Sequence, residues 1–351
     1  MIVINYDSNV MQNTYDSLKA SDIHIYLRHE HSVALKPNLV NSTPASNGAT
    51  THPEVIAGII MFLKEYGVKD ICIIESSAIG ENTNRSYKNC GYESLSQEYD
   101  VPLIDLKNDA VISKSHSGYK LKLCKRALET DFLINVPVLK SHCQTRMTCN
   151  LKNLKGCIPD DEKRRYHTLG LHRPIAALNA LIKTSYCVVD GICGDLSFEE
   201  GGTPIPSNRI ITGRNPVTVD SFCAELIGYH PDNIEYLKTA RDIGVGEYFT
   251  PEMKLVELNT ENKPPYQTQG GRLAERFERN INADSACSVC YSSLIYALYR
   301  LGGNVDSKLY IGQGYQGKSP DGFGIGNCAG GCTKYVPGCP PKAVEIIKHL
   351  K

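Results

Sequence analysis

The chain has 351 residues, of which 41% are hydrophobic, and its 38 basic side chains balance its 38 acidic ones. A chain of this length and apolar content can fold around one large core or two smaller ones. The zero net charge argues against a nucleic-acid-binding protein, because such proteins normally carry an excess of basic side chains. No signal-peptide pattern opens the chain, and no apolar stretch approaches the roughly 18 residues that span a bilayer. We therefore expect a cytoplasmic protein that binds neither membrane nor nucleic acid.

Strand-like and helix-like segments alternate over the first two-thirds of the chain. The expected strands are 32–40, 69–76, 101–106, 131–139 and 185–191, and the expected helices are 52–67, 173–184 and 215–229. Strands that alternate with helices predict an α/β fold with a mostly parallel sheet and helices on both of its faces. In such a sheet, ligands bind at the carboxyl ends of the strands.

The composition changes at residues 260–272, where a Pro-Pro pair, two glutamines and a Gly-Gly pair are typical of a linker. The last five of the chain's 14 cysteines follow this segment. We therefore divide the chain into an α/β domain at 1–262 and a small cysteine-rich segment at 263–351. Most of the nine earlier cysteines lie in apolar runs, where we expect small buried side chains.

Clustered cysteines in a reducing compartment favour metal or redox chemistry over disulfides. Because four thiolates complete an iron–sulfur cubane, we expect one [4Fe–4S] cluster bound by Cys287, Cys290, Cys328 and Cys339. Cys332 is either an alternative to Cys328 or a free redox-active thiol. Structural zinc is the competing interpretation, but zinc sites usually repeat the short cysteine pair or include histidines, and this segment has neither arrangement.

The run VPGCPP, at residues 336–341, resembles the last cluster-binding motif of hydrogenase small subunits and of the related subunit of respiratory complex I. This likeness implies a local cluster-binding turn at Cys339. The glycines at 312–317 fit the pattern G-x-G-x-x-G, but the residues that follow cannot continue a helix, so we expect no dinucleotide site there.

Polar residues that a core would not require follow three of the expected strands. Lys36 and Asn38 follow the first strand, Glu75 ends the second, and Lys140 and His142 follow an apolar strand further along the chain. These residues predict a site for an anionic ligand such as a carboxylate or phosphate. We expect His142 to act as the proton donor, because imidazole titrates near neutrality, with Lys140 as the second catalytic residue.

The segment after His142 adds hydroxyl groups and further cations. If 144–155 is a helix, Thr145, Thr148 and Lys152 lie near one face of it. The expected substrate-binding residues are Lys36, Asn38, Lys152, Asn153 and Lys155. Asp190 and Glu200 follow a later strand, where they either orient a ligand, act in acid–base chemistry or cap a turn.

Several runs between residues 30 and 245 resemble the uncharacterised family numbered 362 among the domains of unknown function. These runs are KPNLV, THPEV, ESS, NVPVLKSH, KNLKG, VVDGICG and NPVTVDSF. The family implies no substrate, but it contains cluster-binding extensions to which the cysteine-rich segment is similar. That segment lacks the closely spaced four-cysteine run of bacterial ferredoxins, so a ferredoxin role does not carry over. The segment that begins at KPN is also similar in pattern to the lactate-racemase group.

Together these features predict an iron–sulfur oxidoreductase of anaerobic metabolism that acts on a small anionic substrate and exchanges electrons with a redox partner protein. Two alternatives remain open. A cluster with an open iron position would act as a Lewis acid in a lyase or desulfidase. A non-catalytic electron carrier or redox sensor would have an exposed cluster and no enclosed pocket near Lys140 and His142.

Overall fold

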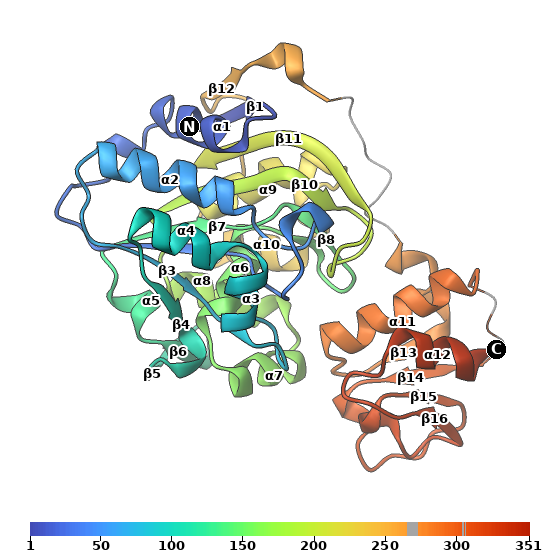
Figure 1. Ribbon diagram of the computed structural model, residues 1–351. Helices are drawn as coiled ribbons and strands as arrows, with labels where there is room; N and C mark the ends of the chain where they lie inside the picture. Colours follow the sequence, from blue (N-terminus) through green and yellow to red (C-terminus); the bar gives the residue numbers. More distant parts are fainter. Residues whose placement is uncertain (265–272, 304, 306) are drawn as a thin grey trace.

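The computed structural model describes residues 1–264, 273–303, 305 and 307–351 (Figure 1). Within these residues, a large α/β unit forms most of the chain and a small α/β unit forms its C-terminal end. The expected linker at 260–272 lies mostly outside the described residues. The domain boundary at 262 therefore stays a prediction.

The large unit is built on an eight-stranded sheet with the order β12-β1-β11-β10-β7-β2-β3-β4. Its strands are β1 (Ile2–Tyr6), β2 (Val33–Pro37), β3 (Ile71–Glu75), β4 (Leu103–Asp105), β7 (Phe132–Val136), β10 (Tyr186–Asp195), β11 (Pro204–Gly213) and β12 (Leu255–Leu258). The two pairings of β11 are antiparallel, and the other neighbouring strands pair in parallel. The prediction of an α/β fold with a mostly parallel sheet is confirmed.

Helices cover both faces of this sheet, as the sequence predicts. The helices of the large unit are α1 (Val10–Lys19), α2 (Pro53–Glu65), α3 (Thr83–Asn89), α4 (Tyr92–Tyr99), α5 (Arg126–Glu129), α6 (Asn150–Asn153), α7 (Asp160–Thr168), α8 (His172–Leu181), α9 (Pro216–Leu226) and α10 (Glu235–Asp242). Along β2, Val33 and Leu35 pack with α1, α2 and α4, whereas Ala34 packs on the opposite face with α8, α9 and α10. This alternation follows from the two-residue repeat of a strand.

Two small hairpins complete the large unit. They are formed by β5 (Val111–His116) with β6 (Tyr119–Cys124), and by β8 (Lys140–His142) with β9 (Arg146–Thr148). The condition of a helix over 144–155 is therefore not met. The helical turn α6 begins only at Asn150, where the carboxylate of Asp220 accepts the backbone N–H groups of Asn150 and Leu151. Thr145 and Thr148 thus do not share a helix face with Lys152.

The C-terminal unit is a four-stranded, fully parallel sheet with two helices. The strands are β13 (Ile281–Ala283), β14 (Leu309–Ile311), β15 (Phe323–Ile325) and β16 (Lys334–Val336), and the helices are α11 (Ser288–Arg300) and α12 (Ala343–Leu350). Leu294, Ile311 and Ile346 lie in a separate hydrophobic core. Among the described residues, no helix has the length and apolar composition required to cross a membrane.

The contact between α1 and α2 depends on Gly58. A Cβ atom at this position would lie 2.5 Å from the backbone oxygen of Met11 and 2.8 Å from Cβ of Thr14. Although alanine has the higher helix propensity, we expect Gly58→Ala to lower the free energy of unfolding by about 1–3 kcal/mol through overpacking. Urea denaturation measures this change. Glu93→Ala, at an exposed position of α4, is the control and should have no measurable effect.

Candidate functional site

The polar residues selected from the sequence meet where neighbouring parallel strands end. β2, β7 and β10 lie side by side and run in the same direction, so their carboxyl ends share one edge of the sheet. Lys36 lies near the end of β2, β8 follows β7, and the loop 196–203 follows β10. This edge is where α/β folds bind ligands.

Glu199 is buried at this edge, where its carboxylate binds two basic side chains and its backbone oxygen binds a third. Its Oε1 lies 2.8 Å from Nζ of Lys152, its Oε2 lies 2.8 Å from Nε2 of His142, and its backbone oxygen accepts a 2.8 Å hydrogen bond from Nζ of Lys140. Burial alone would raise the pKa of Glu199, but His142 and Lys152 hold it well below its usual range. Lys140 also donates to the backbone oxygen of Ala49, and burial lowers its pKa to about 8.

Glu199 was not among the residues selected from the sequence, although the neighbouring Glu200 was. The only sequence signal for it was its place in an acidic and glycine-rich segment after a strand. The carboxylate of Asp195 holds this segment by accepting the backbone N–H groups of Ser197, Phe198 and Thr203. The loop that carries Glu199 is therefore fixed by hydrogen bonds from its own backbone.

His142 is a buried and neutral imidazole. Its Nδ1 accepts hydrogen bonds from the backbone N–H groups of Gln144 and Thr145, at 3.1 and 3.0 Å. The proton of the neutral ring is therefore on Nε2. This nitrogen lies next to the carboxylate of Glu199, but its N–H does not point at the carboxylate well enough to form a hydrogen bond. Burial lowers the pKa of His142 to about 4, so at neutral pH this ring is not an imidazolium acid.

Lys36 forms a closed ion pair instead of facing an open site. Its Nζ lies 2.7 Å from Oε2 of Glu75 and donates to the backbone oxygen of Pro37 at 2.7 Å. The same carboxylate accepts the backbone N–H groups of Leu39 and Ser76. Gly156 closes over this pair, since a Cβ atom there would lie 2.2 Å from Oε1 of Glu75.

Asn38 and Asn153 are also engaged within the protein. Oδ1 of Asn38 accepts the backbone N–H of Val40, which forms a turn after β2. Nδ2 of Asn153 donates to the backbone oxygen of Lys36 and to Oδ1 of Asn135, at 3.1 and 2.8 Å. Both amides thus hold the strand ends in place.

Lys155 differs from the other lysines of the predicted site. It lies in the 3₁₀ turn Leu154–Cys157, and within the described part of the chain its ammonium group forms no hydrogen bond or ion pair. Burial and the nearby charge of Lys152 lower its pKa to about 7, whereas Glu199 and Cys287 raise it. Burial and then the charge of Lys155 lower the pKa of His167, whose buried Nδ1 has no hydrogen-bond partner among the described residues.

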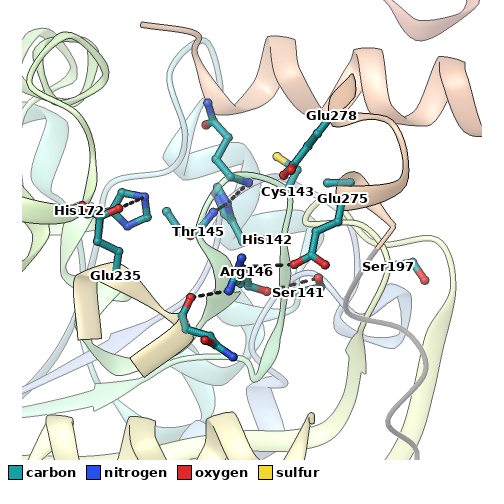
Figure 2. Close-up of a pocket in the computed structure, with 13 residues that line it drawn as sticks. Ser141, His142, Cys143, Thr145, Arg146, His172, Ser197, Glu235, Glu275 and Glu278 are labelled. Carbon is teal, nitrogen blue, oxygen red and sulfur yellow. Dashed lines mark hydrogen bonds and ion pairs between the residues drawn. The ribbon is translucent and has the colours of Figure 1, made fainter. Parts of the chain in front are cut away.

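A cavity of about 230 Å³ opens beside the β8–β9 hairpin (Figure 2). Of the predicted catalytic and substrate-binding residues, only His142 lines it. Its charged walls comprise Arg146, His172, Glu235, Glu275 and Glu278. An anionic ligand would therefore meet more negative than positive charge in this cavity. The four predicted lysines, Lys36, Lys140, Lys152 and Lys155, do not line it.

Arg146 crosses this cavity, and its backbone has an unusual conformation. Its φ angle is +67°, which is uncommon for a residue other than glycine. Its guanidinium group lies 3.4 Å from Oε1 of Glu275 and donates a 2.7 Å hydrogen bond to the backbone oxygen of Asn233. Figure 2 shows this side chain between the hairpin and the segment that leads to the C-terminal unit. The ion pair therefore links the two units.

His142, Cys143 and Glu199 form a group with ligand atoms close enough to hold a metal ion, within 4.8 Å of one another. A metal at Nε2 of His142 would require a free electron pair on that nitrogen. The two hydrogen bonds to Nδ1 instead place the proton on Nε2, and Lys152 already neutralises Glu199. The distances of this group suit a metal ion, but its protonation opposes one.

The four predicted cluster ligands gather at one edge of the C-terminal sheet. Cys287 follows β13, Cys328 follows β15, Cys339 follows β16, and Cys290 lies in the first turn of α11. Because all four strands are parallel, their carboxyl ends meet at the same edge. Burial and then the charges of the other three thiols raise the pKa of the Cys290 thiol to about 12.

Side-chain amides lie against two of these sulfurs. Nε2 of Gln313, which follows β14, lies 3.6 Å from Sγ of Cys287, and Nε2 of Gln316 lies 3.5 Å from Sγ of Cys328. Cys332 is buried nearby, and burial alone raises its pKa. The thiol of Cys332 is not among the groups that shift the pKa of Cys287 or Cys290. The assignment of the ligands stays a prediction, and this arrangement favours Cys328 over Cys332.

The cysteine edge adjoins the Glu199 network. Gln144, in the turn of the β8–β9 hairpin, donates to the backbone oxygen of Ala286 and accepts a 2.8 Å hydrogen bond from Ser288. Glu200, whose pKa is raised to about 7 mainly by burial, accepts a hydrogen bond from Ser292. Burial and then the charges of Cys328 and Cys339 raise the pKa of Cys287, whereas the charges of Lys155 and Arg164 lower it. The two predicted sites therefore lie next to each other.

The Lys36–Glu75 pair can be tested with a double-mutant cycle. Lys36→Met leaves a buried carboxylate without its partner, so we expect a loss of about 3–5 kcal/mol in the free energy of unfolding. Adding Glu75→Gln should recover part of this loss, because no unpaired charge then remains. Urea denaturation of the wild type, both single variants and the double variant gives the coupling energy.

The Lys19–Glu65 pair is the matched control. Its charged atoms are 2.8 Å apart, as in the buried pair, but its side chains are 52% and 53% exposed. The cycle of Lys19→Met and Glu65→Gln should show no measurable coupling, because water screens the charges. Equal coupling in the two cycles would contradict the role of burial.

The lowered pKa of His142 predicts a specific dependence of stability on pH. The unfolded chain binds a proton at this ring below about pH 6.5, whereas the folded protein does so only below about pH 4. Stability should therefore fall as pH drops from 6.5 to 4, by on the order of 3 kcal/mol from this group.

The variant His142→Gln should show a flatter slope of stability against pH over this range. Urea denaturation at several pH values from 4.5 to 7 measures both slopes. The exposed His29 serves as the control, and His29→Gln should keep the wild-type slope. Identical slopes in the wild type and His142→Gln would show that this imidazole binds its proton in the folded protein as it does in the unfolded chain, which would contradict the lowered pKa.

Comparison with known proteins identifies relatives of the large unit. Residues 33–225 match the family model described as "Domain of unknown function (DUF362)". A thylakoid-associated protein of Synechocystis sp. is 36% identical over 197 residues, which cover 56% of this chain and 61% of that protein. The match thus spans less than two thirds of that relative's length.

Two solved structures are similar to part of the chain. The lactate racemase apoprotein from Thermoanaerobacterium thermosaccharolyticum has a TM-score of 0.44 at 12% identity, over 64% of this chain and 57% of that one. A protein from Thermotoga maritima has a TM-score of 0.37 at 13% identity, over 59% and 53% of the two chains. The family model covers more than half of the chain, and the chain belongs to the DUF362 family.

Proposed function

We propose that this protein is an iron–sulfur oxidoreductase in which Cys287, Cys290, Cys328 and Cys339 hold one [4Fe–4S] cluster. The observation that carries the proposal is the parallel C-terminal sheet. Three of its four strands are followed within four residues by one of these cysteines, and the fourth is followed by Gln313. The fold thereby supplies thiols from distant parts of the sequence to a single edge.

The spacing of these thiols supports a cluster over a single zinc ion. Four thiolates around one ion must lie close together, whereas a cubane binds them at four separate corners. Among the described residues, the four cysteines form no group compact enough for one ion. Yet the charges of Cys328 and Cys339 both act on Cys287 and on Cys290.

The surroundings of the cysteines also suit an anionic group. The amide N–H groups of Gln313 and Gln316 lie against Cys287 and Cys328, and Lys155 and Arg164 act on Cys287. Such donors and charges stabilise thiolates and tune the properties of a bound metal centre. When bound, a cluster of this kind supplies one-electron transfer. The exposed thiol of Cys339 marks a side where a redox partner protein can approach.

Lys155 is the lysine that we expect to bind the anionic substrate. The ammonium groups of Lys36, Lys140 and Lys152 are already bound to carboxylates or carbonyl oxygens. Lys155 is the one lysine of the predicted set without such a partner among the described residues. We therefore place the anion between Lys155 and the cysteine edge, with Lys140 and His142 as support for Glu199.

Metal and sulfide analysis of protein purified without oxygen tests the cluster. We expect about four irons and four acid-labile sulfides per chain, with a spin-half EPR signal after reduction by dithionite. Each of Cys287→Ser, Cys290→Ser, Cys328→Ser and Cys339→Ser should lose most of the iron. The matched control is Cys332→Ser, which lies in the same segment and should retain it.

The outcomes separate the alternatives. Zinc without sulfide would contradict the cluster and leave the segment with a structural role. A stable cluster in one of the four serine variants would instead favour an iron with an open position, as in a Lewis-acid lyase. Loss of iron in Cys332→Ser with retention in Cys328→Ser would reverse the choice between these two ligands.

A further inference from the structure

A thiol, an imidazole and a carboxylate form a second constellation at the N-terminal end of α2. Nδ1 of His52, the residue before this helix, lies 2.8 Å from Oδ2 of Asp190. Nε2 of the same ring lies 3.5 Å from Sγ of Cys193. The order of groups is that of an activated nucleophile, in which a base contacts the nucleophile and a third group orients the base.

The hydrogen bonds of Asp190 determine where the protons lie. Its Oδ2 also accepts the backbone N–H of His52 at 2.8 Å, and its Oδ1 accepts the backbone N–H of Ile192 at 3.0 Å. Because the ionised carboxylate only accepts, Nδ1 of His52 must donate to it. The electron pair on Nε2 then faces the thiol of Cys193 and can take its proton.

The charge on Asp190 favours the imidazolium form of His52. Burial alone would lower the pKa of His52, but Asp190 and then Cys193 raise it, to about 11. These are the two charged groups that act on the ring. Proton transfer from Cys193 would therefore give a thiolate–imidazolium pair held by a buried carboxylate.

Cys193 differs from most cysteines of the large unit in its access to solvent. Burial raises the pKa of the thiols of Cys72 and Cys157, to about 11 and 12, which makes them unreactive. Cys193 is partly exposed, and the side chain of His52 retains 13% exposure. Small reagents can reach this thiol.

We propose that Cys193 is a reactive thiolate, activated by His52 and Asp190, that is oxidised by small hydroperoxides. In this reaction the sulfur attacks the nearer peroxide oxygen and the O–O bond breaks. The sulfur loses two electrons and becomes a sulfenic acid. The leaving group, hydroxide from hydrogen peroxide or alkoxide from an organic hydroperoxide, takes the proton from Nε2 of His52 and becomes water or an alcohol.

A carbonyl group near the sulfur favours this chemistry over acyl transfer. The thiol of Cys193 donates a hydrogen bond to the backbone oxygen of Ala45 at 3.5 Å, and this bond is lost when His52 takes the proton. The same carbonyl would repel the oxyanion of an acyl-transfer intermediate, which needs hydrogen-bond donors. A sulfenic acid carries an O–H group, which such a carbonyl can accept. The inference does not depend on the cluster or on the proposed oxidoreductase activity.

Alkylation by iodoacetamide, followed by peptide mass spectrometry, measures the reactivity of Cys193 in the full-length protein. At pH 6, Cys193 should be labelled at least about tenfold faster than a buried thiol of the same chain. Cys90 is the internal control, since its thiol lies 3.1 Å from the backbone oxygen of Thr43 and its pKa is raised by burial. Hydrogen peroxide with a dimedone-type trap should mark Cys193 as a sulfenic acid.

Substitution of the base tests the mechanism. His52→Gln should slow the labelling of Cys193 at pH 6 by about tenfold or more, because the thiolate is then the minor form. The control His29→Gln, at an exposed position, should leave it unchanged. A Cys193 that is labelled no faster than Cys90 at pH 6 in the wild type would overturn the proposal, even if His52→Gln does not fold. Equal profiles in the wild type and His52→Gln would also overturn it.

Discussion

The arrangement of this site depends on one buried carboxylate, that of Glu199. A buried charge is tolerated only when it is paired and hydrogen-bonded, and Glu199 meets Lys152 and His142 through its side chain and Lys140 through its carbonyl oxygen. These partners belong to the β8–β9 hairpin and to α6, so the carboxylate fixes where both lie. The next residue, Glu200, contacts Ser292 of α11 and extends the same constraint to the C-terminal unit.

The carboxyl ends of the parallel strands in the two sheets lie next to each other in this protein. The ends of β2 and β7 lead to the lysines, the end of β10 leads to Glu199, and the ends of β13, β15 and β16 lead to the cysteines. Lys155 from the first edge and Cys287 from the second act on each other's pKa. The same physical rule, that parallel strands end together, thus builds both halves of the candidate site.

The sequence predicted the local features of this fold better than its long-range contacts. Apolar runs correctly indicated β2, β3, β7 and β10, because the strands of a parallel sheet are buried on both faces. By contrast, β11 was not predicted, since its first half is polar and largely exposed. The helix considered as a condition at 144–155 does not form over that range, because Asp220, 70 residues from Asn150, accepts the backbone N–H where α6 begins. Likewise, the cationic pattern at Lys36 could not reveal its partner Glu75, 39 residues away.

The pairing of the lysines limits what their positive charge can do. Lys36 and Lys152 neutralise carboxylates, so neither adds net attraction for an anionic ligand. Lys155 remains, and a partly buried ammonium without a partner is costly unless an anion lies nearby. A cluster bound by four thiolates is itself such an anion, and Cys287 already acts on Lys155. The charge of Lys155 is therefore explained by the cysteine edge even without a substrate, so the cluster and the anionic substrate are separate hypotheses that require separate tests.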